Sequence, residues 1–111
     1  MRSVTNPGNV VAVLHAPPYG SGIDAAPALA KNFKLKKGET MPVGSTAVRD
    51  FIERSQPLLG LHGHVHEGRG TATIGRTLCI NPGSEYTEGI LNGTIVELDD
   101  GRVVSHQLVA G

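Results

Sequence analysis

The sequence predicts a strand-rich α/β fold of the α+β type, with at least one helix and a C-terminal β-hairpin. Composition gives the first reason: 15 of the 111 residues are glycine and 7 are proline, which favours turns and strands and excludes a helical bundle. The second reason is a succession of short apolar runs separated by turn signals, with one stretch of helical period between them. At this length the chain is expected to form a single domain over residues 1–111.

The N-terminal part is expected to hold one strand between irregular segments. Residues 1–8 end in the turn signal Asn6-Pro7-Gly8 and are expected to be irregular. Residues 9–14 are mostly β-branched and apolar on both faces, which predicts a buried strand that stops at His15. Residues 16–44 have no clear period. We therefore expect a long loop, which is unusual in a compact domain unless it is functional or disordered.

One segment has the helical period. Ser45 or Thr46 can cap a helix that runs to about Ser55. The apolar residues of its stripe, at i, i+3 and i+4 spacing, are Val48, Phe51 and Ile52. Gln56-Pro57 is expected to end the helix, because the residue before proline avoids the α region.

The rest of the chain predicts further strands. An apolar run at residues 58–62 follows the helix directly, which is an α/β connection. Residues 71–74 and 77–80 are expected to be short strands joined through Gly75-Arg76. Residues 94–98 and 102–108 flank Asp99-Asp100-Gly101, and an Asp-Gly pair between strands is a strong hairpin signal.

The charges of the chain balance, with 10 Lys and Arg against 10 Asp and Glu. Proteins dedicated to nucleic acids or anionic membranes draw much of their affinity from excess positive charge, so neither partner is expected. The single cysteine, Cys79, cannot close an intrachain disulfide and is expected to be a small core residue. No apolar run approaches the roughly 20 residues that cross a bilayer. We expect a soluble cytoplasmic protein.

Four of the five histidines lie where apolar strands are expected to end. They are His15, His62, His64 and His66. Ligands of α/β proteins often bind at strand ends, because the sheet fixes the position and the loop leaves room. Residues two apart in an extended chain point to the same side about 6.5 Å apart, so His64 and His66 could converge on one metal or on two. His15 alone could equally be structural, and His106 is expected at the surface of the hairpin.

Three local motifs together resemble the calcineurin-like metallophosphoesterases. Gly63-His64-Val65-His66 follows an apolar strand and resembles the Gly-His-x-His motif of that family. The strand that ends in His15-Ala16-Pro17-Pro18 is similar to the family's earlier single-histidine motif, and Asn81-Pro82-Gly83-Ser84 is similar to the loop that commonly follows. The motifs occur in the family's order and spacing, and the resemblance covers about residues 9–98.

The resemblance implies the strand-rich half of a metallophosphoesterase-type αββα sandwich and a metal-dependent hydrolysis of a phosphate mono- or diester. His15 and His64 would bind one metal of a binuclear site, and His66 the other. The complete site would hold two divalent ions, Mn, Fe or Zn. This chain, which carries the second half of that site, would hold one ion or none alone. In this family a metal-bound hydroxide attacks phosphorus, while both ions neutralise charge on the phosphoryl oxygens.

Residues near these motifs have alternative interpretations. His62 is not a ligand in the resemblance, and it would either orient a ligand from behind or belong to the strand alone. Ser84, or the backbone at Gly83, would either contact a phosphate or form a tight turn, since Asn-Pro-Gly favours turns. Basic residues of the long loop would either steer an anionic substrate or simply face solvent. They are Lys31, Lys34, Lys36 and Lys37.

The chain departs from the family in its first half. The family's N-terminal motifs Asp-x-His, Gly-Asp and Gly-Asn-His-Asp/Glu supply the other ligands and a catalytic histidine, and none of them is present. No catalytic residue is therefore identified in this chain. It is expected to be a C-terminal half, as a fragment, a truncated gene product or one part of a split enzyme. Half a sandwich would expose strand edges, so self-association is expected.

Two other interpretations use the same histidines. A non-catalytic metal-binding or interaction module would hold a single zinc or manganese through His15, His64 and His66. A metallo-β-lactamase-type hydrolase would need an acid followed by a histidine after the alternating pair. Glu67-Gly68 follows His66 instead, which argues against that hydrolase.

Overall fold

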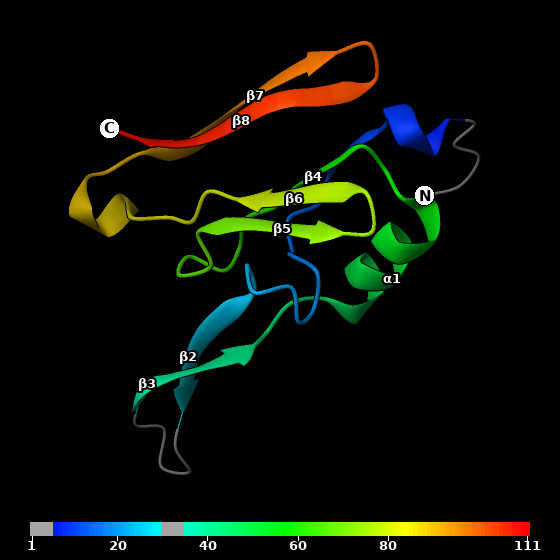
Figure 1. Cartoon of the computed structure of the whole chain (residues 1–111). Helices are drawn as coiled ribbons and strands as arrows, with labels where there is room; N and C mark the ends of the chain where they lie inside the picture. Colours follow the sequence, from blue (N-terminus) through cyan, green and yellow to red (C-terminus); the bar gives the residue numbers. More distant parts are fainter. Residues whose placement is uncertain (1–5, 30–34) are drawn as a thin grey trace.

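A four-stranded mixed sheet forms the centre of the fold (Figure 1). The computed structural model describes residues 6–29 and 35–111. In the sheet, β1 (Val11–Val13) lies beside β4 (Leu59–Leu61), which lies beside β6 (Thr77–Asn81), and these three strands are parallel. β5 (Gly70–Ile74) completes the sheet antiparallel to β6. The strand-rich α/β class predicted from the sequence is confirmed.

The predicted helix is confirmed as α1 (Thr46–Ser55). The Ser45 hydroxyl accepts a hydrogen bond from the Val48 N–H at 3.1 Å, which satisfies one of the free donors of the first turn. Ile52 is fully buried and belongs to one cluster with Ile74 and Cys79. The apolar stripe of α1 therefore covers one face of the sheet.

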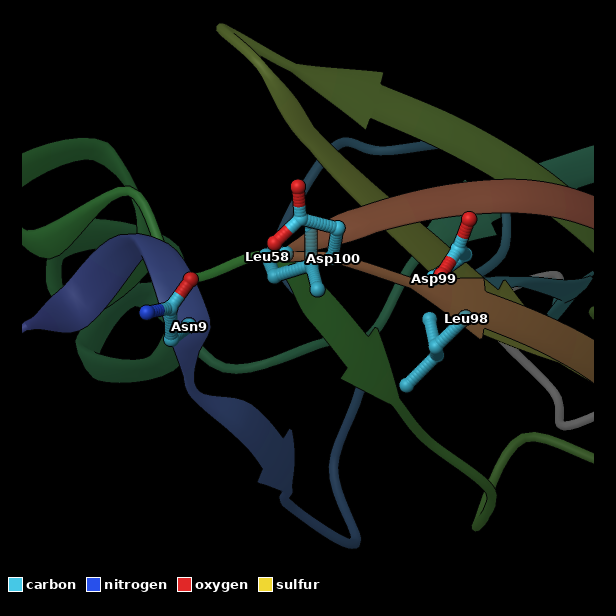
Figure 2. A pocket seen from close by; sticks show the side chains of 6 residues that line it. Asn9, Leu58, Leu98, Asp99 and Asp100 are labelled. Carbon is cyan, nitrogen blue, oxygen red and sulfur yellow. The ribbon is translucent and has the colours of Figure 1, made fainter.

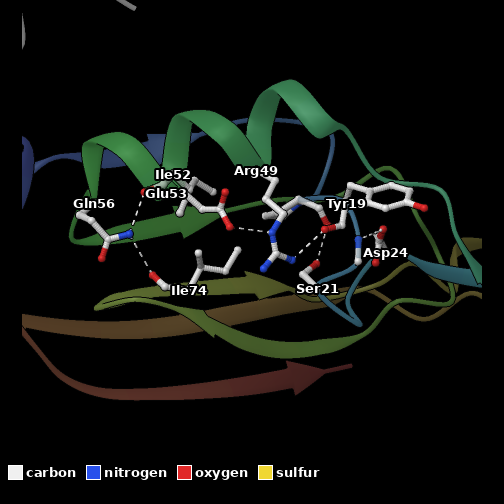
Figure 3. A network of polar contacts seen from close by, with 10 residues as sticks. Tyr19, Ser21, Asp24, Arg49, Ile52, Glu53, Gln56 and Ile74 are labelled. Carbon is white, nitrogen blue, oxygen red and sulfur yellow. Dashed lines mark hydrogen bonds and ion pairs between the residues drawn. The ribbon is translucent and has the colours of Figure 1, made fainter.

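The C-terminal hairpin is also confirmed, as β7 (Asn92–Asp99) and β8 (Arg102–Ala110). Asp100 and Gly101 form its two-residue loop and both have positive φ, 48° and 73°, which is the geometry that favours an Asp-Gly pair. Figures 1 and 3 show the hairpin and α1 on opposite sides of the sheet. Ile80 is buried on the hairpin side, because its neighbour Cys79 faces α1 and side chains alternate along a strand.

The tip of the hairpin returns to the N-terminal part of the chain (Figure 2). A hollow of about 380 Å³ lies there, next to the short 3-10 helix η1 (Pro7–Asn9). Its lining residues are Asn9, Leu58, Leu98, Asp99, Asp100 and Gly101. None of them is a histidine, so this hollow is separate from the predicted metal ligands. The segment expected to be irregular, residues 1–8, contains the start of η1, and residues 1–5 lie outside the described part.

The expected long loop over residues 16–44 is wrong in part. β2 (Ala25–Leu29) and β3 (Leu35–Pro42) pair antiparallel in a two-stranded sheet of their own (Figure 1). Their exposed residues include Pro27 and Thr40. Exposed residues such as these leave no hydrophobic period in the sequence, and hydrogen bonding between the strands satisfies the backbone groups. The side chains of the predicted lysine stretch, residues 31–37, lie outside the described part.

Buried polar groups tie the segment after β1 to the helix (Figure 3). The carboxylate of Asp24, 1% exposed, accepts hydrogen bonds from the N–H groups of Gly20, Gly22 and Gly44 at 2.8, 3.2 and 3.0 Å. Arg49 of α1 donates to the Tyr19 carbonyl at 2.9 Å. These bonds hold residues 17–24 against the start of α1. Within residues 6–29 and 35–111 no helix has the length and apolarity to span a membrane.

Candidate metal centre

His15 and His64 meet at the ends of two neighbouring parallel strands. Val13 of β1 is in register with Leu61 of β4, so the chain segments that follow both strands emerge at the same edge of the sheet. The ring centres of His15 and His64 are 5.0 Å apart, with the ring planes inclined at 68°. Both side chains are exposed to solvent. The sequence therefore contains two imidazoles, 49 positions apart, that the fold brings into contact.

His64 has a conformation that a strand does not allow. Its φ is 60°, in the left-handed region, and the Val65 N–H donates to the Gly63 carbonyl across it at 2.6 Å. Such a backbone is uncommon for a side chain of this size and costs of order 1–3 kcal/mol. The extended geometry expected for the His-x-His run is therefore wrong. A tight turn centred on His64 takes the place of that extended segment.

His66 lies beside η2 (Tyr86–Glu88). Its ring meets that of Tyr86 edge to face, with 5.8 Å between the ring centres. His66 and Ser84 both line a hollow of about 410 Å³, and the Ser84 N–H donates to the His66 carbonyl at 3.1 Å. The other residues that line it are Glu67, Arg69, Glu85, Thr87 and Asn92. The predicted phosphate contact of Ser84 would therefore lie on the His66 side of the site.

The pair formed by His15 and His64 has a spacing that suits one metal ion. Two imidazoles that share a tetrahedral ion at metal–nitrogen distances of about 2.0–2.1 Å have ring centres about 5 Å apart, close to the 5.0 Å between these rings. Protein metal sites usually supply three or four ligands. Among residues 6–29 and 35–111, no group of three or more His, Cys, Asp or Glu side chains is arranged to hold a metal. The described residues bring together a pair of imidazoles.

His62, the residue with two alternative interpretations, is buried behind this pair. Only 6% of it is exposed, and its Nδ1 lies 3.0 Å from the Leu14 carbonyl and 3.1 Å from the Ala16 carbonyl. Burial lowers the pKa of His62 below its ordinary value, and the two carbonyl contacts oppose that shift. The side chain is therefore a neutral imidazole at neutral pH.

Sequence reasoning missed the role of Asn81, the last residue of β6. Its buried side-chain amide donates to the carbonyls of Ile23 and Val65 at 3.0 and 2.9 Å, and its Oδ1 accepts from the Gly83 N–H at 2.9 Å. One side chain thus joins the His64–His66 turn to two other loops. The signal in the sequence is an asparagine placed directly after an apolar strand and before Pro-Gly, a pattern that also predicts a turn. The turn itself is present, with Gly83 at φ 73°.

The two remaining residues singled out in the sequence lie away from the site. His106 is exposed on β8. Cys79 is fully buried in β6, and burial raises the pKa of its thiol to about 11. A thiol that stays protonated and buried is a poor nucleophile. Its place in the core agrees with the expectation for Cys79.

One solved structure is similar to this chain. It is a protein from Aquifex, with 29% sequence identity and a TM-score of 0.52. The similarity covers 72% of this chain and 26% of that protein, so the chain spans about a quarter of the length of the structure that it matches. No family model matches the sequence, and no curated protein matches it. The similarity concerns the fold.

Proposed function

We propose that this chain supplies histidine ligands to the metal site of a metal-dependent phosphoesterase. The observation that carries the proposal is the pair of imidazoles, His15 and His64, with ring centres 5.0 Å apart at the ends of adjacent parallel strands. The two residues belong to the two histidine motifs by which the sequence resembles the calcineurin-like metallophosphoesterases.

The chemistry of the site follows from its residues. Neutral imidazoles bind Mn, Fe or Zn, and a bound divalent ion generates hydroxide and neutralises charge on phosphoryl oxygens. His15 and His64 would hold the first ion, and His66 would serve a second. Ser84 lines the hollow beside His66, where it could donate a hydrogen bond to a phosphate mono- or diester. The balanced charge of the chain, 10 basic against 10 acidic residues, favours a small ester over a nucleic acid.

A complete site needs anionic ligands as well. Two divalent ions close together repel each other, and carboxylates usually offset that repulsion. No group of metal-ligating side chains that includes a carboxylate gathers at the pair within the described residues. The proposal therefore includes a source of further ligands, either a longer polypeptide that contains this chain or a separate chain.

The same observation favours a second candidate function, a non-catalytic metal-binding or interaction module. Two histidine ligands without a carboxylate would hold at most one ion, weakly, and would not position a hydroxide between two ions. Such a module would use His15 and His64 to join this chain to a partner that completes the coordination. Metal stoichiometry and turnover distinguish the module from the enzyme.

The experiment combines both measurements. The chain is loaded with Mn²⁺ or Zn²⁺, the bound metal is counted by mass spectrometry, and hydrolysis of bis-p-nitrophenyl phosphate is followed. Metal-dependent hydrolysis that His15→Ala and His64→Ala abolish and that His106→Ala preserves would support the enzyme, since His106 is an exposed histidine on β8. Metal bound at no more than one ion per chain without hydrolysis would favour the module. Failure to bind any metal would contradict the module. The enzyme would then be tested on the site completed by its further ligands, where the absence of metal-dependent hydrolysis would contradict it.

A further inference from the structure

The segment that carries His15 is held from one side by residues of the next parallel strand. The Leu14 N–H donates to the Leu61 carbonyl at 3.0 Å, and the Gly63 N–H donates to the His15 carbonyl at 2.8 Å. The ring of His62, placed between these two residues, contacts the carbonyls of Leu14 and Ala16. Three successive carbonyls of the His15 segment are therefore bonded to residues 62 and 63.

The contacts of His62 define its tautomer. Carbonyl oxygens only accept hydrogen bonds, so Nδ1, which lies 3.0 and 3.1 Å from two of them, must carry the proton and share it between both. The Nε2 atom is buried and has no hydrogen-bond partner among the described residues. In the neutral ring it is an acceptor, with no proton left unpaired.

Gly60 makes room for this arrangement. A Cβ atom at position 60 would lie 2.6 Å from Nε2 of His62, closer than real contacts allow. The ring therefore packs against the backbone of its own strand two residues earlier, in a slot that only glycine leaves open. In this slot the ring aims Nδ1 at the carbonyls of the His15 segment.

We propose that His62 is a positioning residue: its Nδ1–H, bonded to the carbonyls on both sides of His15, holds the imidazole of His15 against that of His64. One part of the proposal rests on the function proposed above, namely that the positioned pair is presented to a metal ion. Groups that fix the orientation of metal ligands commonly change metal affinity by about 10–100-fold when they are removed. His62 would act through the backbone and would never touch the ion.

The first test uses the unmodified, metal-free chain. Long-range ¹H–¹⁵N correlation of the histidine rings should show His62 protonated at Nδ1, and nuclear Overhauser effects should connect the ring protons of His15 and His64. A His62 ring protonated at Nε2 would overturn the proposal, because such a ring cannot donate to either carbonyl.

The second test uses three variants. His62→Phe keeps the ring but removes the donor. His62→Asn keeps an N–H at the position of Nδ1, and Gly60→Ala displaces the ring without changing it. His62→Phe and Gly60→Ala should lose the His15–His64 Overhauser effects and weaken Co²⁺ binding, read from its visible absorption, at least tenfold. His62→Asn should keep the effects and bind Co²⁺ within threefold of the unmodified chain, since the donor is restored.

Unchanged amide resonances of β7 and β8 would show that the variants remain folded. If His62→Phe does not fold, Gly60→Ala, His62→Asn and the tautomer measurement still decide the matter. Retention of the His15–His64 contact in a folded variant without the donor would overturn the proposal. The His15–His64 contact could depend on the His62 donor as expected while neither the unmodified chain nor any variant binds Co²⁺. In that case the positioning role stands and the proposed metal function fails.

Discussion

The two sides of the candidate metal centre are built differently. On one side, His15 and His64 are held by bonds between β1 and β4 and by the buried ring of His62; we call this the clamped side. On the other, His66 and Ser84 line a hollow, and the ring of His66 meets the exposed ring of Tyr86; we call this the open side. The clamped side offers a preformed pair of ligands, whereas the open side must be ordered by what binds there.

This difference has an energetic meaning. A ligand pair already in place does not lose side-chain freedom on binding, which otherwise costs about 0.5–1.5 kcal/mol for each immobilised side chain. A first metal ion should therefore bind at His15 and His64 before His66 is engaged. Asn81 links the two sides, because its side chain bonds to Val65, between His64 and His66, and to Gly83, next to Ser84.

The largest expected effect is on stability, when the link through Asn81 is removed. Asn81→Ala leaves the buried carbonyls of Ile23 and Val65 and the Gly83 N–H without their partner, and each unpaired buried group costs about 1–3 kcal/mol before relaxation. We expect a loss of about 3 kcal/mol in the free energy of unfolding, measured with urea. Asn9→Ala, at an exposed asparagine, should change it by less than about 0.5 kcal/mol. Equal effects of the two substitutions would refute the linking role.

The next largest effect is on metal affinity, and it compares the clamped side with the open side directly. His15→Ala should weaken binding of the first Co²⁺ about 100-fold, which corresponds to about 2.7 kcal/mol, because it removes one of two preformed ligands. His66→Ala should weaken it less than threefold, because His66 belongs to the open side. Calorimetric titration of both variants measures the two affinities. A larger loss for His66→Ala would reverse the assignment of the sides.

The burial of Cys79 in the core predicts how the free energy of unfolding depends on pH. Burial raises the pKa of its thiol to about 11 from an ordinary value of 9.0, so the unfolded chain loses the proton at lower pH than the folded chain does. The contribution to stability is complete below pH 9 and is lost as the pH rises towards 11. Two pKa units correspond to at most about 2.7 kcal/mol.

Cys79→Ala provides the matched control, since other groups also titrate in that range. The free energy of unfolding of the unmodified chain, relative to that of Cys79→Ala, should fall between pH 9 and 11. A difference that stays constant over this range would mean that water reaches the thiol. Alkylation of Cys79 in the folded chain should be correspondingly slow below pH 9.

Local signals predicted most of the fold. Ser45 in front of an amphipathic stretch placed the start of α1, and Asp100-Gly101 placed the turn between β7 and β8. Each of these features depends on residues within one turn of each other, which a sequence displays directly. β2 and β3 have no such signal, because paired positions such as Pro27 and Thr40 are exposed and carry no apolar period.

The candidate site was predicted less completely, because its geometry depends on long-range contacts. The resemblance to the calcineurin-like metallophosphoesterases implied that His15 and His64 would lie together, whereas the spacing of the residues alone paired His64 with His66. The left-handed turn at His64, which separates His64 from His66, is rare for a non-glycine residue and cannot be read from its neighbours. The bonds of Asn81 to Ile23 and Val65 join positions 58 and 16 residues apart, and their pairing appears only in the fold.

The clamped side is supported from one edge only, which predicts association. β1 pairs with β4 alone within the described sheet, and Val13, immediately before the His15 segment, is 75% exposed. An open strand edge with an apolar side chain favours pairing between copies. Val13→Lys should weaken self-association about tenfold in sedimentation equilibrium, whereas Val104→Lys, at a 55% exposed position on β8, should leave it unchanged. A monomer at all concentrations would contradict the expectation.

The smallest effect is expected on the open side. Edge-to-face aromatic contacts contribute about 0.5–1.5 kcal/mol beyond burial, and the contact between His66 and Tyr86 lies at the lower end, since both side chains are exposed. Tyr86→Leu should therefore cost less than about 0.5 kcal/mol of stability while moving the His66 ring proton resonances, which lose the ring current of Tyr86. The resonances of His15 and His64 should stay in place. If they move as well, the open side is coupled to the clamped side, and His66 is part of the preformed arrangement.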